Sequence, residues 1–270
     1  MTSKILLSTG IFPWMTYSKI IRIAASFGLD GVELVPTRAV MDEFSKQKIT
    51  HLMIKGLHQS WRLDIGHDKS YGISKKTSVF YTVLRLLFFP TAARSTSFLA
   101  SVSKLLSLPV TVHDITAFWT KDKDGIEFAG GLLYEIFGPK AHKPAVLKSW
   151  LKNKHHGVIF DTRDDQSLLY AKHHGFSNWR VFWEWVGLEN VKNIQVTLIG
   201  RQGIRNILSH QKTLIEEQLL WLHLQKWKGT VTLEINPFSV LIESRGKMKQ
   251  PMRKIVEFVR TTIDEGKTWS

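Results

Sequence analysis

The 270-residue sequence contains no cysteine. Disulfide bonds, thiolate metal sites and a cysteine nucleophile are therefore excluded, and a bound metal would need His, Asp or Glu ligands. The chain also lacks an apolar run of the roughly 18 residues that a membrane-spanning helix needs. Residues 1–10 show no charged region followed by a long apolar one, as a signal peptide would. These absences favour a cytoplasmic protein with no membrane association.

Glycine-rich phosphate-binding motifs are missing as well. The two glycine-rich places, Gly130–Gly131 and Gly200–Gly203, do not have the spacing of a phosphate loop or of a dinucleotide-binding turn. We therefore expect no nucleotide cofactor. Internal repeats, low-complexity stretches and linkers are also absent from the sequence, which predicts a single domain over residues 1–270.

Acidic residues are fewer than basic ones. The chain has 23 Asp and Glu against 37 Lys and Arg, which gives a formal net charge of +14. Such a charge favours anionic partners, namely phosphorylated metabolites, nucleic acid or a membrane surface. The basic residues are spread along the chain instead of forming one tail, so solvated helix faces are the competing explanation.

Eight short segments rich in Val, Ile and Leu alternate with helix-like segments along the whole chain. Near-continuous apolar strands are typical of a parallel sheet that is buried on both faces. Eight βα units in a chain of this length predict an α/β protein with a (β/α)₈ TIM barrel, and a doubly wound open sheet is the alternative. The predicted strands cover residues 4–10, 30–36, 53–60, 109–114, 130–137, 157–162, 193–200 and 229–236.

The segments between the strands show helical periodicity. The predicted helices cover residues 17–28, 143–154, 213–227 and 251–266. Gly28 is expected to end the first of them. Segment 78–107 predicts two helices broken at Pro90. The connection at 61–108, between strands three and four, is unusually long and predicts a helical insertion, either a lid over the barrel mouth or a dimerisation arm.

Acidic residues and histidines lie near the carboxyl ends of the predicted strands, where barrel active sites are built. A carboxylate at the end of an apolar strand is costly unless it is paired or binds a metal. Convergent carboxylates bind hard divalent cations, His joins them for softer metals, and carboxylates also move protons at a substrate carbon. The alternative is that each acid pairs with a Lys or Arg at the mouth. The residues concerned are Glu33, Asp114, Glu135, Asp161, Glu234, His58 and His113.

Four basic residues follow directly after predicted strands. They are Arg62, Lys140, Arg163 and Arg201. At the mouth of a barrel such residues can clamp a phosphate or carboxylate group of a substrate. They can equally neutralise the acids of the mouth and take the place of a metal.

These segments resemble the xylose-isomerase-like superfamily of TIM barrels, which contains sugar isomerases and epimerases and the type-2 AP endonucleases. The resemblance covers nearly the whole chain in the order of the strands, and the last segment is the closest match. It implies the barrel fold and a small carbohydrate or sugar phosphate as substrate. The matching segments are GLDGVELVP (28–36), GLHQSW (56–61), VTVHD (110–114), LLYEIFGP (132–139), VIFDTRD (158–164), IQVTLIG (194–200) and GTVTLEINP (229–237).

The resemblance also implies a metal site and a catalytic pair. In that family a divalent metal is commonly held by Glu, Asp, His and Glu on strands five to eight. Carried over, this implies Glu135, Asp161 and Glu234 as ligands of Mn²⁺, Mg²⁺ or Zn²⁺. The two glutamates serve in family epimerases as the acid/base pair, so Glu135 and Glu234 are also the implied catalytic residues.

Three positions depart from the family pattern. Thr197 stands where strand seven usually has His, Asp164 where a His follows the strand-six Asp, and Gly200 where an Asp is usual. Three ligands can still bind Mg²⁺ or Mn²⁺ because water completes the coordination. The missing imidazole weakens the prediction of Zn²⁺ and disfavours the multi-zinc chemistry of the AP endonucleases.

The leading hypothesis is therefore a metal-dependent isomerase or epimerase that acts on a small sugar or sugar phosphate. Glu135 and Glu234 would move a proton next to a carbonyl group that the metal polarises. The residues expected to bind the substrate are His58, His113, Arg62 and Arg163. A catalytically degenerate barrel that binds an anionic ligand or a partner protein is the second hypothesis. Nucleic-acid processing like that of the AP endonucleases is the third.

Overall fold

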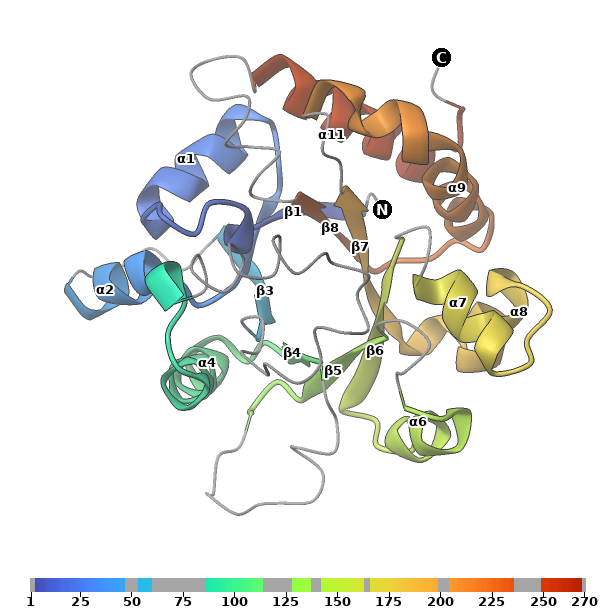
Figure 1. Cartoon of the computed structure of the whole chain (residues 1–270), viewed down its shortest axis with the longest axis horizontal. Helices are drawn as coiled ribbons and strands as arrows, with labels where there is room; N and C mark the ends of the chain where they lie inside the picture. Colours follow the sequence, from blue (N-terminus) through green and yellow to red (C-terminus); the bar gives the residue numbers. More distant parts are fainter. Residues whose placement is uncertain are drawn as a thin grey trace.

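Eight parallel β-strands close into a barrel in the computed structural model of this chain (Figure 1). The structure describes residues 3–46, 53–59, 86–113, 128–136, 142–162, 166–198, 204–235 and 249–268. The strands are β1 (Lys4–Ser8), β2 (Gly31–Leu34), β3 (Ile54–His58), β4 (Val110–Val112), β5 (Leu132–Ile136), β6 (His156–Asp161), β7 (Val191–Leu198) and β8 (Thr230–Ile235). They lie in chain order and β1 pairs with β8, so the predicted TIM barrel is confirmed and the open sheet is wrong.

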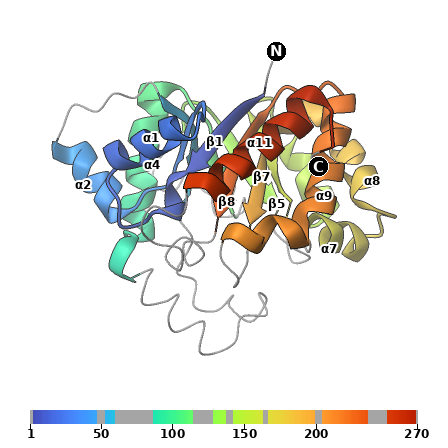
Figure 2. The same cartoon turned by 90° about the horizontal axis from the view of Figure 1, so that it is seen from above.

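Helices surround the barrel, and the described ones lie in most of the connections between successive strands (Figures 1 and 2). They are α1 (Tyr17–Ser26), α2 (Arg38–Lys46), α4 (Ala92–Leu106), α6 (Pro144–Trp150), α7 (Gln166–His173), α8 (Trp179–Val186), α9 (Ile204–Leu224) and α11 (Lys249–Glu265), with short 3-10 turns at Thr9–Ile11 and Leu188–Asn190. In the described part of the chain, no helix is long and apolar enough to span a membrane.

The long connection between β3 and β4 contains α4. This helix begins after Thr91, whose hydroxyl oxygen accepts a hydrogen bond from the Arg94 N–H. Pro90 lies just before this cap, as the predicted helix break requires. Residues 61–85 of the predicted insertion lie outside the described residues, so its role as a lid or a dimerisation arm stays a prediction.

Polar and apolar side chains alternate along β7 from Asn193 onward and along the whole of β8. The amide of Asn193 on β7 donates a hydrogen bond to Glu33 on β2, although β8 and β1 lie between these strands, so this contact crosses the inside of the barrel. Because side chains alternate between the two faces of a strand, Gln195 and Thr197 face the same interior. The intervening Ile194, Val196 and Leu198 belong to the apolar core outside the barrel. The barrel interior is therefore polar on this side.

The apolar core lies between the strands and the helices. On β6, Phe160 stacks on Trp183 of α8, with ring centroids 4.6 Å apart and an interplanar angle of 6°. Trp150 of α6 donates its indole N–H to the carbonyl oxygen of Gly157. These fully buried aromatic contacts fix the helices on the strands and leave the barrel interior free for polar side chains.

Candidate functional site

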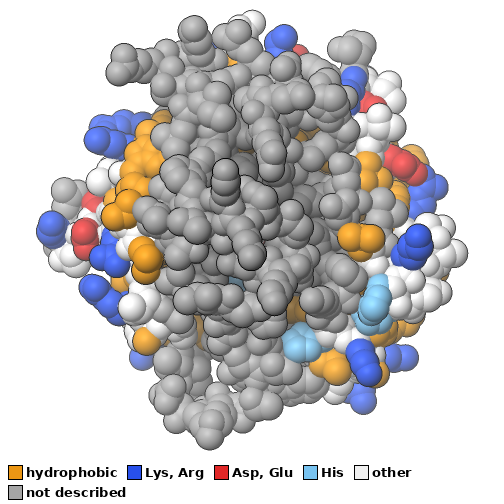
Figure 3. All heavy atoms as spheres, in the orientation of Figure 1, with side chains coloured by type: hydrophobic (Ala, Val, Ile, Leu, Met, Phe, Trp, Pro, Cys, Tyr) orange, Lys and Arg blue, Asp and Glu red, His pale blue; other side chains and the backbone are white. Residues whose placement is uncertain are grey.

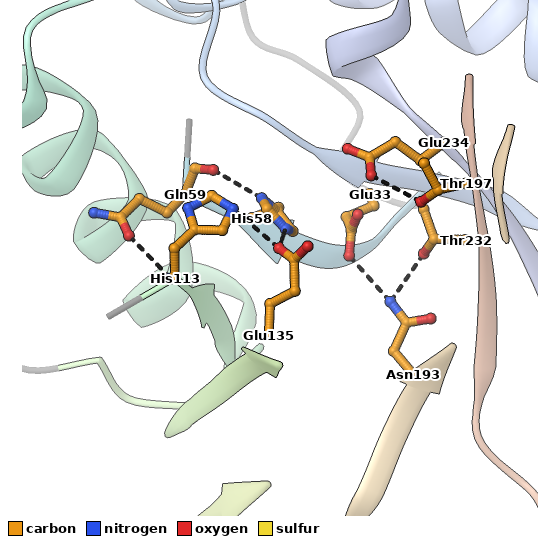
Figure 4. A network of polar contacts seen from close by, with 9 residues as sticks. All are labelled: Glu33, His58, Gln59, His113, Glu135, Asn193, Thr197, Thr232 and Glu234. Carbon is orange, nitrogen blue, oxygen red and sulfur yellow. Dashed lines mark hydrogen bonds and ion pairs between the residues drawn. The ribbon is translucent and has the colours of Figure 1, made fainter. Parts of the chain in front are cut away.

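Three side chains from neighbouring strands meet at the carboxyl ends of those strands (Figure 4). His58 is the last residue of β3, His113 directly follows β4, and Glu135 lies near the end of β5. The Nε2 atoms of His58 and His113 are each 3.0 Å from Oε2 of Glu135. Since parallel strands of a barrel end at the same rim, three residues that are far apart in the sequence form one group.

Gln59 forms hydrogen bonds with both histidines, through the imidazole of His58 and the backbone of His113. Nδ1 of His58 lies 2.7 Å from the carbonyl oxygen of Gln59, and a carbonyl oxygen only accepts, so this nitrogen carries a hydrogen. The side-chain oxygen of Gln59 accepts the backbone N–H of His113. Nε2 of His58 is thereby directed at Glu135, as partners of metal-binding histidines direct the coordinating nitrogen.

His58 and Glu135 form a buried pair of opposite charges. Burial works against a charged Glu135, but His113 and His58 outweigh it and hold the pKa of its carboxyl well below the usual range. Burial also works against a charged His58, yet its hydrogen bond to Glu135 and the nearby carboxylates raise the pKa of its imidazole to about 10. At neutral pH a proton therefore lies between His58 and Glu135.

These three residues fit a divalent metal. Their ligand atoms all lie within 4.8 Å of one another, and no other such group of three occurs among the described residues. Two imidazole nitrogens and one carboxylate oxygen are the donor set of many catalytic zinc sites. Loss of the proton from Nε2 of His58 would free a lone pair directed at the same point. His58 and His113 can thus supply the imidazole ligands that the sequence lacks at position 197, where Thr stands.

A second polar layer crosses the barrel beside this group. Glu33 on β2 accepts a hydrogen bond of 3.1 Å from the Asn193 amide, which also donates to Thr232 on β8 at 2.9 Å. The Glu33 side chain lies over Gly56, where an added Cβ would be 3.4 Å from its Cγ, an ordinary van der Waals contact. Burial raises the pKa of Glu33 to about 7, helped by the carboxylates of Glu234 and Glu135.

Glu234 on β8 differs from the other carboxylates because it is partly exposed. Thr197, in the adjacent position of β7, donates its hydroxyl hydrogen to Oε2 of Glu234 at 3.2 Å. Thr197 therefore orients one oxygen of this carboxylate, and within the described ranges no hydrogen bond to the other oxygen is seen. A carboxylate held in this way can accept a proton from a substrate.

The site residues predicted from the sequence fall into three groups. His58, His113 and Glu135 come together, whereas Glu234 lies across the interior beyond Glu33 (Figure 4). Asp161 is fully buried at the end of β6. The metal set of Glu135, Asp161 and Glu234 stays a prediction, since the group within metal-binding distance contains only Glu135 of the three. Residues that lie outside the described residues are Arg62, Asp114, Lys140, Arg163, Asp164, Gly200 and Arg201.

Sequence reasoning missed Gln59 and Asn193. Gln59 directly follows a strand-end histidine, and Asn193 starts the polar alternation of β7. That alternation, with Asn193, Gln195 and Thr197 every second residue, was the available signal, because it predicts one polar face on an otherwise buried strand.

No protein-family model matches this sequence, and no curated protein matches it. Among solved structures, the chain is similar to one described as the structure of L-ribulose 3-epimerase, with a TM-score of 0.53 and 13% sequence identity. The alignment covers 98% of this chain and 96% of that chain. The two chains therefore share the fold of a closed eight-stranded parallel barrel over nearly their full lengths.

Proposed function

We propose that this protein is a metal-dependent isomerase or epimerase that acts on a small sugar or sugar phosphate. The observation that carries the proposal is the His58, His113 and Glu135 group at the carboxyl ends of β3, β4 and β5. Its place in the barrel is where enzymes of this fold have their active sites. The epimerase among the structural neighbours supports carbohydrate chemistry in a barrel of this shape.

His58, His113 and Glu135 would hold the divalent metal. When bound, the metal would supply Lewis-acid polarisation of a substrate carbonyl and stabilise the enediolate. Glu135 suits the role of ligand because it is 3% exposed and both histidines already contact one of its oxygens. Its low pKa keeps it anionic, as a metal ligand must be.

Glu234 is the group that we assign to proton abstraction. It is partly exposed, and the Thr197 hydroxyl fixes one of its oxygens. A single carboxylate can remove a proton from one carbon and return it to the next on the same face, which gives aldose–ketose isomerisation. Epimerisation needs a second group on the opposite face, the role that the family resemblance gives to Glu135.

The test is hydrogen exchange next to the carbonyl. Metal-free protein is loaded with Zn²⁺ or Mn²⁺ and incubated in D₂O with a panel of ketoses, aldoses and their phosphates, and deuterium incorporation is followed by NMR. We expect exchange with at least one of these sugars. Glu234→Gln should lower the rate by about 10²–10⁴-fold, the usual contribution of a general base. Unchanged exchange in this variant would remove Glu234 from the mechanism.

Two controls make the result specific. Glu257→Gln changes an exposed carboxylate on the outer helix α11 and should leave exchange unchanged. Metal content of Glu234→Gln separates the two ligand sets, because the variant keeps its metal if His58, His113 and Glu135 bind it. It loses metal if Glu234 is a ligand. Wild-type protein that holds metal but exchanges no sugar hydrogen would contradict the proposed activity.

A further inference from the structure

Two adjacent leucines are exposed in the connection between β3 and β4. Leu86 and Leu87 are 57% and 59% exposed. The next residue, Phe88, is partly buried and contacts Trp14, which lies between β1 and α1, with ring centroids 6.2 Å apart. Single exposed leucines need no explanation, but a contiguous apolar surface usually marks a place where a protein binds something. The pair of leucines therefore needs a partner.

The apolar surface continues from Trp14 along α1. An open hollow of about 320 Å³ is lined by Met15, Lys19, Arg22, Ile23 and Ser26, the last four of which belong to α1. Because residues three and four positions apart lie on one face of a helix, these side chains form one outward stripe. The stripe combines apolar side chains with two cations. Hydrophobic and basic side chains also lie side by side along the left edge of Figure 3, on the side of α1 and α2 (Figure 1).

The cations around this surface are not paired with acids. Lys19, Arg22 and Arg38 are exposed, and none of them forms an ion pair within the described ranges, in contrast to the arginines of α8 and α11. Arg38 instead donates to the carbonyl oxygen of Phe89 at 3.3 Å, which joins α2 to the leucine segment. The exposed charged residues of α1, α2 and residues 86–94 are five bases, Lys19, Arg22, Arg38, Lys46 and Arg94, and one acid, Asp42. This side of the molecule is therefore locally basic.

These residues lie at the end of the barrel where the strands finish. Trp14 follows β1, Arg38 begins α2 after β2, and Leu86 and Leu87 come after β3 and before α4. Connections that leave the carboxyl ends of the strands lie at the mouth of a barrel. The helices α1, α2 and α4 also lie on the same side of the barrel (Figures 1 and 2). A flat surface is therefore the kind of partner that contacts them together.

Aliphatic side chains beside unpaired cations suit an anionic lipid surface. Leucine has no ring on which a nucleic-acid base can stack, and contacts with the phosphates of a duplex need cations without an apolar patch. At a bilayer, leucines enter the boundary between headgroups and acyl chains, while Lys and Arg contact the anionic headgroups. Binding of this kind needs no spanning helix, so it is compatible with the described helices, none of which could cross a membrane.

We propose that this face docks the protein peripherally on an anionic phospholipid surface: Leu86 and Leu87 enter the interface, and Lys19, Arg22 and Arg38 contact the lipid phosphates. The inference does not depend on the metal site of the proposed function. It adds a location for the proposed chemistry, because docking by this face puts the mouth of the barrel beside the headgroups.

Sedimentation with lipid vesicles tests this proposal. The full chain is mixed with vesicles of phosphatidylcholine alone or of phosphatidylcholine and phosphatidylserine in a roughly 3:1 ratio, and the bound fraction over a lipid series gives the partition constant. We expect the wild type to bind the mixed vesicles and not the phosphatidylcholine vesicles. Added salt should weaken this binding, because it screens the attraction between the cations and the anionic lipid.

Two double variants separate the apolar contribution from the charged one. Lys19→Gln/Arg22→Gln removes two of the cations and should lower the partition constant about 25-fold, or roughly fivefold for each charge. Leu86→Gln/Leu87→Gln should lower it at least about tenfold, because two leucines no longer enter the interface. All four side chains are exposed, so their replacement should leave the far-ultraviolet circular dichroism spectrum unchanged.

Matched controls make the same changes elsewhere on the molecule. Leu224→Gln replaces a leucine that is 73% exposed at the end of α9. Lys148→Gln/Lys152→Gln removes two exposed cations on and just after α6, which lies on the other side of the barrel from α1 and α2 (Figure 1). Both controls should bind the mixed vesicles as the wild type does, because they leave the docking face unchanged.

Each outcome decides the proposal. Failure of the wild type to bind the mixed vesicles overturns it, and so does equal binding to phosphatidylcholine alone. Binding that Lys19→Gln/Arg22→Gln keeps at wild-type strength overturns it as well, whether or not the leucine variant folds. A wild-type dimer in sedimentation velocity that Leu86→Gln/Leu87→Gln converts to a monomer, without vesicle binding, would assign the leucines to a second copy of this chain instead. None of these results affects zinc binding at His58, His113 and Glu135, so failure here is distinct from failure of the proposed function.

Discussion

Glu135 is the anion that both histidines of the site contact. Replacing it by Gln removes the charge but keeps the size, and leaves the buried His58 imidazolium without its counter-ion. Breaking a buried pair in this way costs about 3–5 kcal/mol. We therefore expect Glu135→Gln to lower the free energy of unfolding by roughly that amount near pH 6, as measured by urea denaturation of the metal-free protein.

The pH dependence of this loss follows from the two pKa shifts. His58 is raised to about 10, so its stabilising effect is complete below pH 6.5 and is lost as the pH rises toward 10. Glu135 is lowered, so its effect is present above its ordinary pKa of 4.5 and is lost as the pH falls through the folded value. The difference between wild type and variant should be largest near pH 6 and shrink toward pH 10. A difference that grows between pH 6 and pH 10 would contradict this assignment.

A double-mutant cycle tests whether the stability comes from this pair. His58→Asn and Glu135→Gln are measured singly and together. Because the two side chains are in contact, the double variant should be more stable than the sum of the single effects, by a coupling energy of about 0.5–3 kcal/mol. Additive effects would show that other neighbours, His113 first, stabilise Glu135.

At the scale of single residues, the sequence predicts which residues belong to the site better than it predicts which residues they contact. The strand-end positions of His58, Glu135 and Glu234 mark them as site residues, because the ends of parallel strands meet. It cannot predict that His58 and His113 share one oxygen of Glu135, since that depends on rotamers and on Gln59. Contacts across the barrel, such as that of Glu33 with Asn193, join residues that are 160 positions apart in the sequence, so the sequence pattern does not predict them.

At the scale of elements, the strands are predicted well because apolar runs flanked by glycine and proline mark them. Helices are predicted less well: α9 begins at Ile204 instead of residue 213, and α2, α7 and α8 are missing from the prediction. The polar alternation of β7 and β8 contradicts the expectation of near-continuous apolar strands. The physical reason is that this barrel fills part of its interior with hydrogen-bonding side chains, so only the outward face of these strands is apolar.

The end of α1 depends on a glycine, as predicted. Gly28 has φ of +73°, and the N–H of Leu29 bonds the carbonyl oxygen of Ala24, which closes the last turn of the helix. A Cβ at Gly28 would meet no atom within 4 Å, so the cost of substitution is conformational. We expect Gly28→Ala to lower the free energy of unfolding by about 1 kcal/mol in urea denaturation.

Asparagine is the matched comparison, because it adopts the left-handed conformation more readily than alanine. Gly28→Asn should therefore lose less stability than Gly28→Ala, and both variants should bind zinc as the wild type does. A loss of several kcal/mol in either variant would mean that the added side chain disturbs the packing of α1.

At the scale of the whole molecule, the barrel follows from the repeated pattern of strands and helices. Whether the molecule binds nucleic acid depends on how its charges are arranged on the surface. The net charge of +14 is compatible with nucleic acid. Several described basic residues are paired with acids, as Arg260 is with Asp30 and Arg180 with Glu217. On the face shown in Figure 3, acidic side chains lie beside several of the basic ones around the edge. Around this edge the two signs are mixed, whereas a face that binds a nucleic-acid duplex concentrates Lys and Arg.

This arrangement predicts weak DNA binding. A protein that concentrates Lys and Arg on one face loses affinity steeply with salt, in proportion to the number of phosphates it contacts. Here we expect the dissociation constant for a short duplex to be weaker than about 10⁻⁶ M at physiological salt, the limit of ordinary non-specific binding. An abasic site in the duplex should not change it. Fluorescence anisotropy across a salt series measures both, with the metal-loaded protein. Submicromolar binding that favours the abasic duplex, together with strand cleavage that Glu135→Gln abolishes, would instead establish nucleic-acid processing at the same three residues.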